Sequence, residues 1–540
     1  MERIQKSLRT LIFWEITISI ILLILGIYHG LMQVLYRAGI IKSVSFLGLT
    51  YYQGLTLHGV VNAIVLTTFF AVAFGNAIIY HYLKKPINTK IAWLSFWLML
   101  IGTLLAAYAI LIQKTDVLYT FYPPLIAPPA FYIGAVLLVV GSWVAFFNWI
   151  PTYLSYKKEN KYTPLAVFGI LTTFLIWFLC TIPVAIEILF MLLPKSLGLV
   201  QEINNLLART LFWMFGHALV YFWLLPVYIG LYTLLPKVIS SKLFSDTFAR
   251  VSFVLFILFS IPVGVHHQYA DPGIGTSWKL IQGFLTFMVA IPSFITAFTV
   301  AATLEYGARR NGSNGLLSWL FKLPYFDKEK WLFAYFISGL FVFILGGITG
   351  IVNASYNVNL VVHNTSYVPG HFHLTVGGLV FLGILGISLY LISKVTGKEI
   401  PLKTLNLLVP YLWLIGSVIF GISMMVGGVL GIPRRTNMGL TYANPESPLY
   451  HPDWMIWNYI ALIGGIIMFL AMVFYFIVFF SLLFSKKVNE EKIEIEDAES
   501  LDKADSKLLN EFKVWIVLAL ILIVIAYTFV YYDVIRTTGG

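Results

Sequence analysis

Long apolar segments decide what this chain can fold into. Thirteen of them run almost without charge for the roughly 20 residues that a helix needs to cross a lipid bilayer. They fall at about 10–34, 55–82, 91–113, 127–153, 164–193, 205–236, 247–267, 277–304, 331–353, 367–393, 405–430, 454–485 and 512–533. Only 11% of the residues are charged, against about 25% in soluble domains. The pattern predicts an all-α, polytopic membrane helix bundle of about thirteen transmembrane helices.

Basic residues predict the orientation of the bundle. Of the 35 Lys and Arg residues, 26 fall at the N-terminus or in the loops that share its side. Because positively charged loops stay in the cytoplasm, the N-terminus is expected there and the C-terminus outside. Arg3, Lys6 and Arg9 precede the first apolar run, which lacks a small-residue cleavage site and is therefore expected to be an anchor. The net charge of +11 thus reflects topology and is no sign of nucleic-acid binding.

One long polar stretch interrupts the apolar pattern. It covers residues 486–511 and mixes acidic and basic side chains. We expect it to be a charged cytoplasmic linker before the last helix, within a single membrane domain that spans residues 1–540.

Six of the ten histidines stand out in or at the ends of apolar runs, whereas His29 and His81, near the ends of two such runs, are expected at the membrane interface. The six are His58, His217, His266, His267, His371 and His373. An ionisable side chain in hydrocarbon is costly and marks a functional site, and imidazole binds copper and iron well. The predicted topology brings all six to a similar depth in the outer half of the membrane. The sequence therefore predicts more than one metal centre.

Spacing along the helices separates these ligands. Residues i and i+2 of a helix point about 200° apart, so His371 and His373 face opposite sides and serve different centres. Adjacent His266 and His267 can reach one metal because a proline and a glycine just before them loosen the helix end. His217 and Tyr221 form an i, i+4 pair, which places a phenol beside any metal that His217 holds.

Cysteine usage limits the kinds of metal site. Cys180 is the one cysteine of the chain. Disulfides, thiolate zinc sites, iron–sulfur clusters and haem attachment through paired cysteines are therefore excluded within it. A dinuclear copper centre built on paired cysteines would have to lie on another subunit.

Four motifs resemble subunit I of the haem–copper oxygen reductases, and most closely the B family of ba-type cytochrome oxidases. They are WMFGHALVYFWLLPVYIGLYTLLPK (213–237), VGVHHQYADPGIG (263–275), HNTSYVPGHFHLTVGG (363–378) and GIPRRTN (431–437). The similarity extends from about His58 to beyond Arg435. It implies a proton-translocating terminal respiratory oxidase that reduces O2 to water at a high-spin haem/copper centre fed by a low-spin haem.

The resemblance assigns a role to each motif residue. His58 and His373 would be axial ligands of the low-spin haem, and His371 the ligand of the high-spin haem. His217, His266 and His267 would hold one copper, and Tyr221 would be the catalytic tyrosine covalently linked to His217. Arg434 and Arg435 would contact the haem propionates, a role that suits guanidinium groups. The low-spin haem would be b-type and the high-spin haem a-type or b-type.

A single proton pathway is implied as well. Its residues would be Tyr228, Tyr232, Ser245, Thr296 and Thr299, which the resemblance places on the cytoplasmic side of the metal centres. The chain reads HALVY where related A-family enzymes read HPEVY, so Ala218 and Leu219 leave the acidic second pathway missing. Asn359 stands where an acidic residue near the propionates is expected.

The implied setting is a prokaryotic inner membrane, which the chain would cross many times. Expected partners are a subunit II with a dinuclear copper centre, a small helical subunit, and cytochrome c or quinol as electron donor. A nitric oxide reductase-like enzyme with non-haem metal is one alternative, which Tyr221 and the lack of a glutamate near His217 oppose. A proton-coupled transporter that uses histidine relays is another, and it would be colourless.

Overall fold

The fold is known from a computed structural model, which describes residues 2–42 and 47–537. Within them, twelve helical segments are long and apolar enough to cross a membrane. They are α1 (Glu2–Arg37), α2 to α3 (Tyr51–Leu83), α4 (Thr89–Leu111), α5 (Pro129–Glu159), α6 to α7 (Leu165–Ser196), α8 (Asn205–Val238), α10 to α11 (Thr276–Arg310), η5 to α12 (Lys328–Ala354), α14 to α15 (Tyr367–Thr396), α16 (Lys403–Val429), α17 (Pro452–Phe484) and α18 (Lys513–Thr537). The described residues contain isolated β-bridges but no strand, so the all-α prediction is confirmed.

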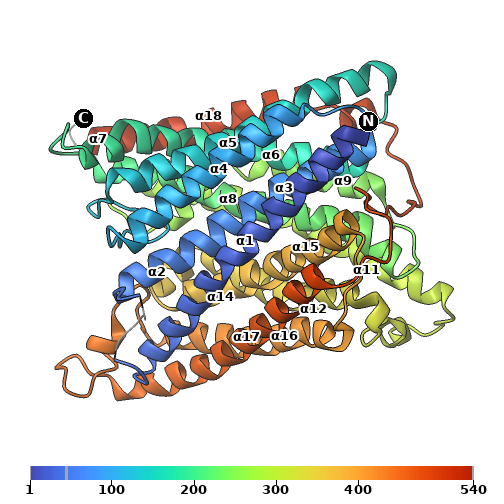
Figure 1. The fold of residues 1–540 in the computed structure, drawn as a ribbon. Coiled ribbons are helices and arrows are strands. Elements are labelled where there is room, and N and C mark those ends of the chain that lie inside the picture. Colours follow the sequence, from blue (N-terminus) through green and yellow to red (C-terminus); the bar gives the residue numbers. More distant parts are fainter. Residues whose placement is uncertain (1, 43–46, 538–540) are drawn as a thin grey trace.

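The seventh predicted helix is the one that departs from a regular span. Helix α9 (Asp246–Phe259) has 14 residues, about 21 Å of rise, and ends before the break at Pro262 and Gly264. The chain then continues without helical structure to the short turn η3 (Val265–Gln268). The two termini lie at opposite ends of the bundle (Figure 1), which requires an odd number of crossings. Helix α9 and the segment after it thus form the remaining one of the thirteen predicted crossings.

Three crossings contain a π-helical stretch. Segment η1 (Val60–Val65) follows His58 in the second crossing, and η6 (Thr375–Val380) follows His373 in the tenth. A third, η2 (Ile188–Leu192), lies in the fifth crossing. π-Bulges inside helices occur mostly at functional sites, because they rotate the residues before and after them relative to each other.

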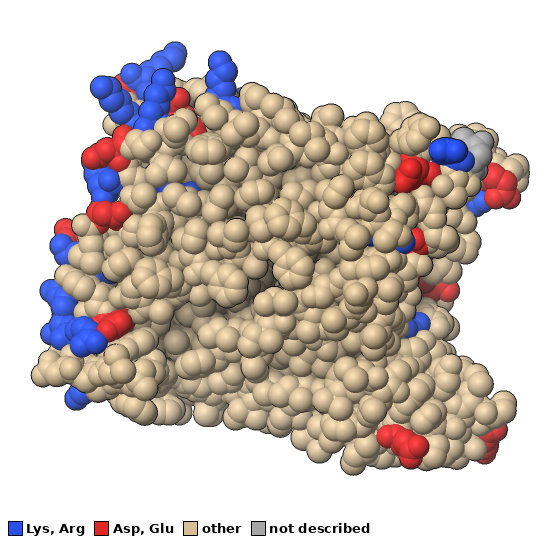
Figure 2. Space-filling view, turned by 180° about the vertical axis from the view of Figure 1, so that it is seen from behind, with Lys and Arg blue, Asp and Glu red and all other residues tan. Residues whose placement is uncertain are grey.

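Charged residues divide the surface of the bundle. Lys and Arg side chains gather along the edge where the N-terminus lies (Figure 2), which we call the N-terminal face. The linker 486–511 crosses this face and forms ion pairs with it, including Arg9–Glu491 at 2.7 Å, Lys394–Glu496 at 2.7 Å and Lys242–Glu499 at 2.7 Å. The basic edge agrees with the predicted cytoplasmic side.

The histidine-bearing crossings lie at the centre of the bundle. In the most apolar part of the second and sixth crossings, 94% and 89% of residues are buried, against 22% in α18. Outer helices pack closely through small residues: a Cβ on Gly102 of α4 would lie 2.5 Å from the carbonyl oxygen of Gly134 of α5. The core therefore shields the histidines from lipid.

Candidate metal centre

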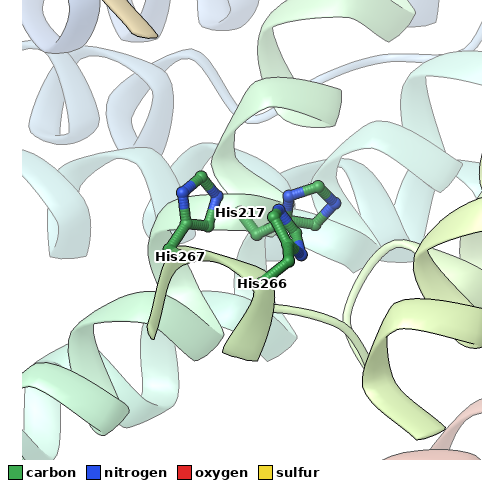
Figure 3. A group of neighbouring side chains, drawn as sticks. All are labelled: His217, His266 and His267. Atoms are coloured by element: carbon green, nitrogen blue, oxygen red, sulfur yellow. The ribbon is translucent and has the colours of Figure 1, made fainter. Parts of the chain in front are cut away.

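Three histidines converge inside the bundle. His217 comes from α8, whereas His266 and His267 come from η3 (Figure 3). One ring nitrogen from each lies within 4.8 Å of the others. Nε2 of His217 and Nε2 of His267 are buried without any hydrogen-bond partner. Buried nitrogens without partners are costly, so this arrangement fits a bound cation that all three lone pairs reach.

The break after α9 allows neighbouring histidines to converge. The His267 amide donates to the Gly264 carbonyl at 3.1 Å, which closes the short turn after the break. The His266 and His267 ring centroids lie 4.2 Å apart, and the His267 ring stacks on Trp213 at 3.8 Å. A continuous α-helix would have turned these two side chains about 100° apart.

Tyr221 lies one helical turn after His217 in α8. The two ring centroids are 5.2 Å apart, and the Tyr221 ring also packs against Phe256 of α9 at 5.2 Å. The phenol therefore borders the three-histidine group.

A second pair of histidines lies across a cavity. The ring centroids of His58 and His373 are 6.3 Å apart, with ring planes 11° from parallel. Two imidazoles that bind one iron from opposite sides, with metal–nitrogen bonds of about 2 Å, hold their centroids about 6 Å apart. The cavity of about 290 Å³ beside them is mostly apolar and is also lined by Arg434 and Arg435. The residues present fit a haem held between two histidines.

Outer hydrogen bonds orient these imidazoles. Nδ1 of His58 lies 2.8 Å from the Gly26 carbonyl, and Nδ1 of His373 lies 2.7 Å from the Pro369 carbonyl. Nδ1 of His371 lies 3.1 Å from the Gly346 carbonyl. Since a carbonyl only accepts, each Nδ1 carries the proton and each Nε2 keeps the lone pair that a metal needs.

His371 and His373 face different neighbours, as their spacing requires. His371 points to α12, where a Cβ on Gly350 would lie 3.3 Å from its ring and where Thr349 Oγ1 lies 2.8 Å from its Nδ1. His373 points to the opposite side, toward His58 and toward Phe420 at 4.7 Å between ring centroids. Helix α14 (Tyr367–Leu374) thus stands between two separate imidazole groups.

Two arginines border the His58–His373 cavity, and neither has an acidic partner among the described residues. Arg434 donates to Asn364 Oδ1 at 3.0 Å, and its Nε is buried without a partner. Burial, helped by the neighbouring Arg435 charge, lowers the Arg434 pKa to about 10. Arg435 lies over the rings of Tyr119 and Tyr122, at 5.8 and 5.4 Å. Cations placed this way fit the carboxylates of a haem.

The predicted hydroxyl pathway is only partly continuous in the structure. The Tyr232 hydroxyl lies 2.6 Å from Thr296 Oγ1, and Tyr228 donates to Ser293 at 3.4 Å. Thr299 donates to the Ile295 carbonyl of its own helix, and Ser245 donates to Asp502 of the linker at 2.8 Å. No direct hydrogen bond among the described residues joins Ser245 to Tyr232.

Sequence reasoning missed several polar neighbours of the site. Ser252 lies 2.8 Å from Thr296 and extends the hydroxyl group around Tyr232; its i, i+7 spacing from Ser245 was the available signal. Thr286 and Thr349 contact ring nitrogens of His266 and His371. His29, expected near the interface, is completely buried instead. His363, with no role from the sequence, pairs its Nδ1 with Asn359 at 3.1 Å, and burial lowers its pKa to about 4.

Comparison with known proteins identifies the architecture. Residues 10–467 match the family described as Cytochrome C and Quinol oxidase polypeptide I. The chain belongs to this family. It is 42% identical over 488 residues to cytochrome c oxidase subunit 1 of Thermus thermophilus, which covers 88% of this chain and 85% of that protein. A cytochrome c oxidase polypeptide 1 of Halobacterium salinarum is 27% identical over 71% of this chain and 65% of that protein.

A solved structure gives the same answer. The chain superposes on a heme-copper terminal oxidase dimer with a TM-score of 0.95 and 53% identity, over 98% of this chain and 93% of that chain. The protein is thus the catalytic subunit of a haem–copper terminal oxidase, and its predicted place in the B family is confirmed. It is a multi-pass membrane protein that binds haem and copper and works on O2 with other oxidase subunits. Neither alternative function is favoured.

Proposed function

We propose that this chain reduces O2 to water at a centre of one high-spin haem and one copper, fed by electrons from one low-spin haem, and couples this to proton uptake and pumping. When bound, the two haems and the copper supply electron transfer and O2 activation. The protein holds these groups, orients them, excludes bulk water and delivers protons. Electrons would come from cytochrome c if the partner subunit II carries a dinuclear copper centre, and from quinol if that centre is absent.

One observation carries the proposal: a single short helix presents imidazoles to two sides. His373 would share the low-spin haem with His58, and His371 would hold the high-spin haem on the other side of α14. The 6.3 Å separation of the His58 and His373 rings supports this pairing. Both ligands come from one helix, so the two haems would lie close enough for fast electron transfer.

The copper would be held by His217, His266 and His267. Their proximity and the two unpartnered Nε2 atoms support this assignment. Tyr221 would be the catalytic tyrosine, covalently linked to His217, and would give a proton and an electron from its phenol during O2 reduction. Its position one turn from His217 supports this role.

Protons would travel from the N-terminal face through Ser245, Thr299, Thr296, Tyr232 and Tyr228 to Tyr221. The Tyr232–Thr296 contact at 2.6 Å supports one step of this pathway, and water would have to bridge the gap between Ser245 and Tyr232. Arg434 and Arg435 would bind the haem propionates, and these carboxylates would neutralise the positive charge of the two arginines.

The proposed setting is a prokaryotic inner membrane, with the linker 486–511 on the cytoplasmic side of a single membrane domain. A low-spin haem of b-type, a high-spin haem of a-type or b-type and a small helical subunit complete the proposal. The solved relative is described as a dimer, so the oligomeric state of this oxidase should be measured for a dimer as well.

The variant His217→Ala tests the two-site assignment. It should abolish O2 reduction and copper binding, because one of three ligands is lost, while the absorption of the low-spin haem between His58 and His373 stays unchanged. Reduced-minus-oxidised spectra and metal analysis of the purified oxidase measure both. Loss of the low-spin spectrum would contradict the separation of the sites, and non-haem iron in place of copper would favour a nitric oxide reductase.

A further inference from the structure

Helix α10 (Thr276–Met288) turns one polar face toward the segment that carries His266 and His267. Lys279, Gln282 and Thr286 are spaced i, i+3 and i+7, so they lie one above another on the same side of the helix. Each of the three side chains contacts residues 264–271, which we call the ligand loop. From Leu280 onward, the exposed residues of α10, such as Leu280 and Phe284, are apolar.

Thr286 determines which nitrogen of His266 carries the proton. The Thr286 hydroxyl donates to the Gln282 carbonyl at 2.7 Å, so its oxygen is free to accept. His266 Nδ1 lies 3.1 Å from that oxygen and therefore acts as the donor. A neutral imidazole with its proton on Nδ1 keeps its lone pair on Nε2. Thr286 thus prepares His266 to bind a metal through Nε2.

Gln282 fixes the start of the ligand loop. Its Oε1 accepts the Gly264 amide at 3.2 Å, and its Nε2 donates to the Ala526 carbonyl of α18 at 3.1 Å. The loop also packs against α18 directly, because Val265 is completely buried in a cluster with Tyr527 and Val530. One buried amide therefore joins three segments at the point where the α9 helix has ended.

Lys279 fixes the end of the ligand loop. The residue is 7% exposed, and its ammonium group donates to the carbonyls of Tyr269 at 2.8 Å and of Asp271 at 2.6 Å. The Asp271 carboxylate pairs with Arg209 of α8 at 3.1 Å. Both ends of the loop are thus held, and His266 and His267 lie between them.

We propose that Lys279, Gln282 and Thr286 are positioning residues for the copper, and that Thr286 acts by fixing the tautomer of His266. The inference rests on the proposed function, because it assumes that His217, His266 and His267 hold that copper. The ligand loop is not part of a long helix that would orient its side chains, so side chains of the neighbouring helix α10 orient them. Outer partners of this kind change metal affinity by about 10- to 100-fold.

The test compares Thr286→Val with Thr286→Ser in the whole purified oxidase. Valine keeps the shape but cannot accept from Nδ1, so copper should be lost to a Cu(I) chelator about 10- to 100-fold more readily, whereas serine should restore retention. The infrared C–O stretch of carbon monoxide photolysed from the high-spin haem onto this copper should shift in the valine variant. That band reports this copper alone, whatever copper a partner subunit holds.

Thr528→Val is the matched control, because Thr528 is on the exposed side of α18 and its hydroxyl contacts only the Val524 carbonyl of its own helix. Its copper retention and C–O stretch should equal those of the unchanged enzyme. Equal retention and an unchanged stretch in Thr286→Val would overturn the inference. If that variant fails to assemble, the same copper measurements are made on Gln282→Glu and Gln282→Leu. Glutamate can still accept from the Gly264 amide and should retain copper better than leucine, which cannot. If the enzyme without any substitution contained no copper at this site, the proposed function itself would be refuted.

Discussion

At the scale of single residues, glycines make room for the imidazoles. A Cβ on Gly30 of α1 would lie 2.9 Å from Cε1 and 3.0 Å from Nδ1 of His58. The His58 ring cannot move away freely, because its Nδ1 is bound to the Gly26 carbonyl. Only glycine therefore lets α1 approach the ring this closely.

Gly30→Ala should displace His58 and weaken the low-spin haem site proposed between His58 and His373. Overpacking of this kind costs about 1–3 kcal/mol, which corresponds to roughly a 5- to 150-fold loss of haem affinity. The absorption band and midpoint potential of the low-spin haem measure the effect. Gly347→Ala is the control, since a Cβ there meets nothing within 4 Å, and it should leave that haem unchanged. An unaltered band in Gly30→Ala would show that the ring is not confined.

The sequence could predict which imidazoles diverge but not what orients them. The opposite directions of His371 and His373 follow from helical geometry alone. Backbone carbonyls are among the partners that orient them, such as that of Gly346, 25 residues from His371, and a backbone carbonyl leaves no side-chain signal in the sequence. Thr286 has no motif either, because its role depends on where the broken end of α9 meets α10.

At the scale of helices, the hydroxyls between α8, α9 and α11 (Ala290–Arg310) offer a test of proton delivery. Tyr232→Phe removes the hydroxyl that lies 2.6 Å from Thr296, and turnover should fall by about 100-fold or more while both haem spectra remain. Thr299→Val should slow turnover less, because the Thr299 hydroxyl contacts only its own helix. Steady-state O2 consumption and dye-reported proton uptake measure both. Normal proton uptake in Tyr232→Phe would exclude the pathway.

Helix positions were predictable because apolar length is a strong signal, and the exceptions have physical reasons. The predicted 405–430 helix corresponds to Lys403–Val429, and 454–485 to Pro452–Phe484. The predicted 247–267 helix stops at Phe259, since proline and glycine at 262 and 264 break it. The π-helical stretches after His58 and His373 were not predictable. A turn with one extra residue has the same apolar composition as an α-helical turn, so the sequence carries no signal for it.

At the scale of the whole molecule, the linker 486–511 is a packed part of the bundle. Its composition suggested only a solvated connection, yet Ile495 is 1% exposed and the Glu499 carbonyl accepts the Leu243 amide at 2.8 Å. Partners such as Leu243 and Glu499 lie more than 200 positions apart, so local sequence could not reveal the contact. The linker thereby joins the last helix to the loops beside α9 and α15 (Phe381–Thr396).

Arg250 is the buried centre of that attachment. Completely buried, it contacts both Asp246 carboxylate oxygens at 3.0 Å and donates to the carbonyls of Thr163 at 2.7 Å and Leu509 at 3.1 Å. Arg250→Met should leave the Asp246 carboxylate, 4% exposed, without its cation and cost about 3–5 kcal/mol. Thermal unfolding of the purified oxidase and limited proteolysis of the linker measure the loss.

Arg309→Met provides the matched comparison for Arg250→Met. Arg309 also pairs with an acid four residues earlier, Glu305, but the two side chains are 40% and 38% exposed. Solvent screens such a pair, so its removal should cost at most about 0.5 kcal/mol and leave the linker resistant to protease. If both variants unfolded alike, burial around Arg250 would not be what holds the linker to the N-terminal face. A larger loss in Arg250→Met alone, with cleavage confined to 486–511, would show that this one guanidinium fastens the last crossing to the rest of the bundle.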